Sequence, residues 1–234
     1  QATDLGLAVL LCVLGAIGLE GSVGTSSAVV VIIAASLLGA LLAWVITRFK
    51  LPALFALALV LLVTLVFAAP LATPDHAVLG FLPGPSSIRA FVDGLINAWR
   101  RLLTTLTPSG TDDGLLVVPY LTCLLGALVT GLVAIRTRRL AAVLAAPIVV
   151  LAVSVLFGTR RAYSLVWQGL VLAVVALAWL ALRAARERRT YLQSDGLRRM
   201  GWAALMLAVV AALGLGVGQR LPFVSAETRY VLRD

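Results

Sequence analysis

Long apolar segments without interior charges are the feature that most constrains the fold of this sequence. A helix needs about 20 apolar residues to cross the hydrocarbon core of a bilayer. Only 12% of the residues are charged, whereas soluble domains carry about 25%. We therefore predict an all-α fold, a polytopic membrane helix bundle of about seven transmembrane helices with one interfacial amphipathic helix on the outer side. The predicted spans are Leu5–Leu19, Ser27–Thr47, Leu51–Ala69, Leu115–Ile135, Leu140–Gly158, Ala162–Leu182 and Gly201–Gln219.

The positions of the arginines and the single lysine predict the orientation of this bundle, because loops rich in these residues stay in the cytoplasm. Eleven of these residues lie in the loops after the second, fourth and sixth spans, and eight are spread over more loop on the other side. We therefore expect a multi-pass protein of the plasma membrane with a cytoplasmic N-terminus and an extracytoplasmic C-terminus. Residues 1–220 would form the bundle, and residues 221–234 would begin an extracytoplasmic segment.

The long outer loop between the third and fourth spans contains a segment with helical periodicity, residues 86–106. Its apolar residues recur at three- and four-residue steps and form one stripe, while polar residues occupy the other face. We predict an amphipathic helix that begins with Ser86 as its N-cap and lies in the interface plane. The stripe comprises Ile88, Phe91, Val92, Leu95, Trp99, Leu102, Leu103 and Leu106.

Four residues of this helix are candidates for interfacial contacts. Trp99 is expected at headgroup depth, with Arg100 and Arg101 near lipid phosphates, and Asp93 lies on the polar face. The helix could be a lid that seals the outer ends of the bundle, a docking surface for a soluble domain, or a gate. The sequence leaves these three alternatives open.

A cluster of six arginines follows the sixth span and is expected to contact anionic lipids of the inner leaflet or a cytoplasmic partner. Other residues are expected to organise helix packing: Gly39, Gly214 and Gly218 occur in small-xxx-small patterns. Pro147 should kink the fifth span, and Gln168 should form a hydrogen bond across helices. The arginines of the cluster are Arg183, Arg186, Arg188, Arg189, Arg198 and Arg199.

The sequence contains no arrangement typical of catalysis or of metal binding. Cys12 and Cys123 lie within apolar runs, and the only histidine, His76, lies in a polar loop. We therefore predict no catalytic residue, cofactor or metal in these residues. The net charge of +9 is explained by membrane topology, so no binding to nucleic acid is expected. The spans also lack the carboxylates and histidines that ion-coupled transporters place at the membrane midplane.

From Trp99 onward the sequence resembles a known family of membrane proteins. WRRLLTT at 99–105, a polar turn, GLLVVPYL at 114–121, a span ending IRTRR at 135–139 and a proline-containing span are similar to the N-terminal membrane region of TgpA-type, actinobacterial transglutaminase-like proteins. The ending RYVLRD at 229–234 resembles the entrance to that family's extracytoplasmic region. The resemblance implies a papain-like Cys-His-Asp domain beyond Asp234, a MoxR-type AAA+ ATPase and a von Willebrand-like protein as partners.

These observations predict a module that anchors and orients an extracytoplasmic transglutaminase-like domain at the bacterial envelope. On this hypothesis any acyltransferase or protease activity belongs to residues beyond Asp234. The alternative is a transporter, a channel or a lipid-handling protein that acts through the bundle. A scaffold for protein assembly is the third hypothesis.

Overall fold

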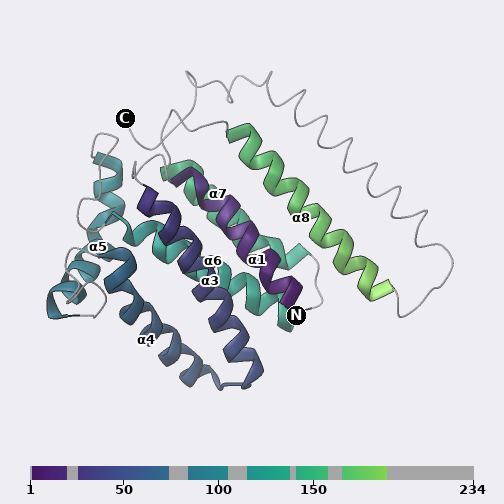
Figure 1. Ribbon diagram of the computed structural model, residues 1–234, viewed down its shortest axis with the longest axis horizontal. Helices are drawn as coiled ribbons and strands as arrows, with labels where there is room; N and C mark the ends of the chain where they lie inside the picture. The colour runs from purple at the N-terminus through teal and green to yellow at the C-terminus, as the bar shows by residue number, and fades with distance from the viewer. Residues whose placement is uncertain are drawn as a thin grey trace.

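The computed structural model describes residues 2–19, 26–73, 84–104, 115–137, 141–157 and 165–188, and these residues form helices and short connections (Figure 1). Figure 1 shows α1, α3, α6 and α7 in the middle of the molecule, with α4 and α8 on opposite sides. The elements in chain order are α1 (Ala2–Ala16), η1 (Ile17–Leu19), α3 (Ser26–Arg48), α4 (Ala53–Ala72), α5 (Pro85–Thr104), α6 (Val117–Arg136), η3 (Ala141–Leu144), α7 (Ala145–Phe157) and α8 (Leu165–Arg188).

Three of the described helices, α3, α4 and α6, are long and apolar enough to cross a membrane. Shorter apolar helices occur at Thr3–Leu19, Ala142–Phe157 and Gln168–Arg183. The chain is therefore an all-helical membrane protein as far as the structure describes it, but the predicted number of seven spans is not confirmed. The predicted seventh span, residues 201–219, lies outside the described residues.

The centre of the bundle is α6, on which twelve of 20 residues are buried. Its glycines allow other helices to approach closely. A Cβ atom on Gly131 would meet the side chain of Ala43 on α3 at 2.7 Å, and one on Gly126 would meet the side chain of Val150 on α7 at 2.5 Å. Because lipid tails are as apolar as leucine, such close packing replaces the hydrophobic effect as the force between helices.

Helix α3 contributes the matching small residue, Gly39. A Cβ atom on Gly39 would meet the carbonyl oxygen of Leu124, the amide nitrogen of Leu128 at 2.9 Å and the Cβ of Ala127 at 3.0 Å. Two of these atoms are backbone, so the axes of α3 and α6 can come this close only because residue 39 has no side chain. Gly39 thus lies at a close helix contact, whereas Gly214 and Gly218 lie outside the described residues.

The fifth predicted span contains Pro147, and the kink predicted there stays a prediction. The segment begins as a 3-10 helix at Ala141, and the α-helix begins only at Ala145, so Pro147 occupies the first turn of α7. A first-turn residue has no partner for its backbone N–H, and proline therefore fits there without breaking a helical hydrogen bond. Because α7 begins at Ala145, Pro147 lies where its missing N–H donor costs little stability.

The α3–α6 contact predicts that Gly39→Ala is destabilising. The added methyl group would overlap backbone atoms of α6, so the variant should lose about 1–3 kcal/mol of stability and melt at a lower temperature in detergent. Gly169→Ala on α8 is the matched control, because a Cβ there meets no atom within 4 Å. The control should be neutral or slightly stabilising, since alanine is the better helix former. A Gly39→Ala protein that melts at or above the wild-type temperature would contradict this packing.

Candidate functional site

Contacts between helices define two ends of the bundle. At one end, the indole Nε1–H of Trp179 on α8 donates to Oδ1 of Asp4 on α1 at 2.9 Å. At the other end, Nε2 of Gln168 on α8 donates to the carbonyl oxygens of Leu14 and Gly15 on α1 at 2.8 and 3.0 Å. Helices α1 and α8 are therefore antiparallel. Gln168 makes a hydrogen bond across helices, as the sequence predicts, and it does so at the point where α1 changes into η1.

Tyr120 joins α5 and α4 to the central helix at the Gln168 end of the bundle. Its hydroxyl group donates to the carbonyl oxygen of Thr64 on α4 at 2.9 Å. Its ring contacts the ring of Phe91 on α5 edge to face, with 6.3 Å between the ring centroids. Tyr120 is fully buried, so this junction holds α5 against the bundle. The sequence does not predict this junction.

The face that α5 buries differs from the predicted apolar stripe. Ser87, Phe91 and Gly94 are buried against the bundle, while Ile88, Val92, Leu95 and Ile96 are exposed, Ile96 by 69%. Small side chains allow α5 to approach α4 and α6, and the larger aliphatic side chains point outward. Exposed aliphatic residues on an amphipathic helix are suited to contact with lipid at the interface.

The polar face of α5 carries Asp93, one of the predicted contact residues. Asp93 is exposed, and its Oδ1 accepts a hydrogen bond from Nδ2 of Asn97 at 2.7 Å, one helical turn away. The helix also begins one residue earlier than predicted, at Pro85, so Ser86 is not its N-cap. Trp99, Arg100 and Arg101 belong to the last part of α5, but their side chains lie outside the described residues.

Among the predicted cytoplasmic arginines, the structure describes the side chain of Arg183. Its Nη2 donates to the carbonyl oxygens of Ala134 and Thr137 at 2.6 Å each. Arg183 thereby satisfies carbonyl groups at the C-terminus of α6, where a cation is also favoured by the helix dipole. Arg186 and Arg188 belong to α8 with side chains outside the described residues, and Arg189, Arg198 and Arg199 lie outside them altogether.

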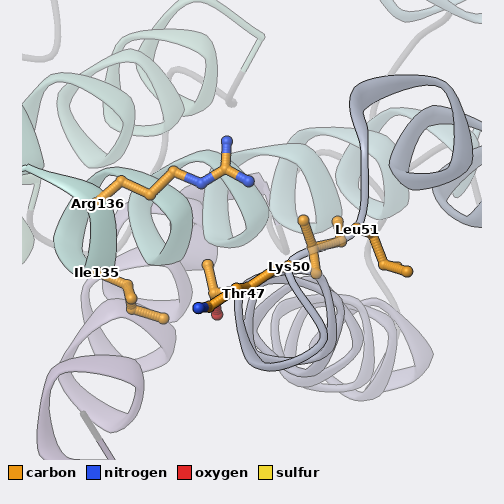
Figure 2. A pocket seen from close by; sticks show the side chains of 6 residues that line it. Thr47, Lys50, Leu51, Ile135 and Arg136 are labelled. Atoms are coloured by element: carbon orange, nitrogen blue, oxygen red, sulfur yellow. The ribbon is translucent and has the colours of Figure 1, made fainter.

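The end of the bundle at which Arg183 lies also has an open pocket of about 290 Å³, between the end of α3, the start of α4 and the end of α6. Figure 2 shows Thr47, Lys50 and Leu51 on one wall and Ile135 and Arg136 on the other. Lys50 and Arg136 were assigned above only to membrane topology. Sequence separation hides their proximity, because they belong to helices that are neighbours only in the fold.

Three buried polar side chains of the apolar helices bond to the backbone of their own helix. Ser36, Thr64 and Thr130 donate to the carbonyl oxygens four residues earlier, each at 2.7 Å. No group of three or more metal-ligating residues occurs in this part of the chain. Cys12 and Cys123 are free and buried, and His76 lies outside the described residues. The described polar side chains therefore cap helices or make contacts at the surface.

Comparisons with known proteins add no relative to these observations. No family model, curated protein or solved structure matches the chain.

The Tyr120 junction predicts that Tyr120→Phe loosens α5. Loss of a buried hydrogen bond costs about 1 kcal/mol, so the backbone amides of residues 85–104 should exchange hydrogen faster than in the wild type. Thr64→Val is the matched control, because it keeps the carbonyl group that accepts the bond from Tyr120. Equal exchange of α5 in Tyr120→Phe and wild type, or equal acceleration in the control, would show that the hydroxyl group does not hold the helix.

Proposed function

We propose that this chain is a membrane-embedded module that anchors and orients an extracytoplasmic transglutaminase-like domain following Asp234. The observation that carries the proposal is the resemblance of residues 99–139 and 229–234 to the membrane region of that family. The packing of the bundle is compatible with an anchor. Its central helix is mostly buried, and Tyr120, Gln168 and Arg183 donate to carbonyl groups of neighbouring helices.

In this proposal α5 supports the soluble domain at the outer end of the bundle. Tyr120 and Phe91 attach α5 to α6, and the exposed Arg89 and Asp93 present charge away from that contact. A helix that is held on one face and charged on another offers a rigid platform for a folded domain. The predicted contacts of Trp99, Arg100 and Arg101 with headgroups or with that domain belong to the same proposal.

The basic end then faces the cytoplasm. The ends of α3, α6 and α8 carry Arg48, Arg136 and Arg183, and the start of α1 lies at this end through Asp4. Cytoplasmic loops carry the excess of arginine and lysine. A MoxR-type ATPase, which the family resemblance implies as a partner, would meet the protein on this side, and the von Willebrand-like protein is the second implied partner.

The decisive test is a pair of reporter fusions. Alkaline phosphatase fused after Asp234 should be active, because the enzyme folds only outside the cytoplasm. The same reporter fused after Arg188, at the end of α8, should be inactive. Activity at Arg188 and none at Asp234 would overturn the orientation. The open reading frame beyond Asp234 provides the second arm, since the proposal requires codons for a domain with a cysteine and a histidine.

Flux measurements in liposomes separate an anchor from a transporter. We expect no flux of ions or small solutes through the reconstituted wild-type chain. Gln168→Leu should instead lower the melting temperature, because the carbonyl groups of Leu14 and Gly15 lose their donor. Flux through the wild type that Gln168→Leu abolishes, with no change in melting temperature, would support a transporter and contradict the anchor.

A further inference from the structure

The pocket at the basic end brings together residues that lie far apart in the sequence. It is lined by Ile46, Thr47, Lys50, Leu51, Ile135 and Arg136, which belong to the end of α3, the turn into α4 and the end of α6 (Figure 2). Three of these side chains are aliphatic, one is a hydroxyl and two are cations. Among the residues that the structure describes, the lining contains no carboxylate, so an anion that enters meets cationic or neutral groups there.

Both cations are available to a ligand. Lys50 and Arg136 are exposed, and neither has a hydrogen-bond or ion-pair partner among the residues that the structure describes. Arg136 is not needed to satisfy the carbonyl oxygens of Ala134 and Thr137 at the end of α6, because Arg183 donates to both of them. Two cations that are unpaired within the described ranges and line one pocket are suited to charge-assisted hydrogen bonds with a phosphate group.

The backbone at Lys50 has a defined conformation. The N–H of Leu51 donates to the carbonyl oxygen of Ile46 at 3.1 Å, and both side chains belong to one apolar cluster. This is the Schellman arrangement that ends a helix, and it places Lys50 in the left-handed conformation with φ 49°. Glycine is the usual residue at this position, and lysine is strained there. The chain therefore carries a cation where helix termination alone would favour glycine.

The position of the pocket specifies the source of the phosphate. Helices α3 and α6 are two of the three candidate spans, and the pocket lies at their last residues, where lipid headgroups meet the ends of transmembrane helices. The aliphatic side chains of Ile46 and Leu51 join the pocket to an apolar cluster of the bundle. A headgroup bound here can keep its acyl chains in the bilayer, which a soluble anion does not require.

We propose that this pocket binds the phosphate of an anionic phospholipid headgroup between Lys50 and Arg136. The aliphatic lining contacts the glycerol and the first acyl carbons. The proposal requires only that α3 and α6 cross the membrane, and it stands whether or not a soluble domain follows Asp234.

The test measures binding of short-chain phosphatidic acid to the full chain, purified and delipidated in a neutral detergent, by tryptophan fluorescence or native mass spectrometry. Lys50→Gly and Arg136→Gln should each lower the affinity about tenfold, as expected for loss of one charge-assisted bond. Arg48→Gln is the matched control, because Arg48 is an exposed cation of the same end that does not line the pocket. Its affinity should stay within about twofold of the wild type.

Lys50→Gly also separates binding from folding. Glycine relieves the left-handed strain, so this variant should melt at or above the wild-type temperature while its lipid affinity falls. Phosphatidylcholine and inorganic phosphate are the comparison ligands, and both should bind more weakly than phosphatidic acid. Equal losses of affinity in Arg48→Gln and the pocket variants would overturn the site. Binding of inorganic phosphate as tight as that of the lipid would overturn the lipid assignment.

Discussion

The backbone contact between α3 and α6 at Gly39 is the constraint on which the other helix contacts depend. It brings α6 close enough to α3 for Ala43 to fill the space beside Gly131, and it leaves the remaining faces of α6 for α1, α7 and α5. Val150 of α7 then packs against Gly126, and Phe91 of α5 packs against Tyr120. Each partner of α6 meets it through a small residue or a specific aromatic contact. In lipid, where apolar burial provides little force between helices, this is how association becomes specific.

The surrounding lipid also explains why the bundle leaves large apolar side chains exposed. On α4, Leu54 is 80% exposed and Phe55 is 68% exposed, a state that water would penalise and hydrocarbon does not. The buried residues of α4 are instead small or polar, and they include Thr64 and Ala68. On α4, the side that faces protein is thus marked by small side chains, and the side that faces lipid by large ones.

Large apolar residues that face lipid and small residues that face protein limit what the sequence could predict. Hydropathy alone locates α3 at 26–48 and α6 at 117–136 within two residues of the predicted spans, because the length of an apolar run does not depend on packing. The choice of face does depend on packing. Leucine is apolar on both sides of a span, so periodicity could not show that α5 buries Ser87 and Gly94 while Ile88 and Ile96 stay exposed. The small-xxx-small spacing that ends at Gly39 and the amide of Gln168 within an apolar run carried information on contacts.

The pocket residues were beyond sequence reasoning for a different reason. Lys50 and Arg136 lie 86 positions apart, and each alone is an ordinary basic residue at the end of a span. Their common pocket becomes visible only in the fold. Gln168 satisfies the carbonyl groups of Leu14 and Gly15 near the end of α1, and Arg183 satisfies those of Ala134 and Thr137. Helix termination therefore explains Gln168 and Arg183, whereas the two cations of the pocket make no such bond within the described residues. When a polar group makes no bond within the fold, the binding of a ligand best explains its presence.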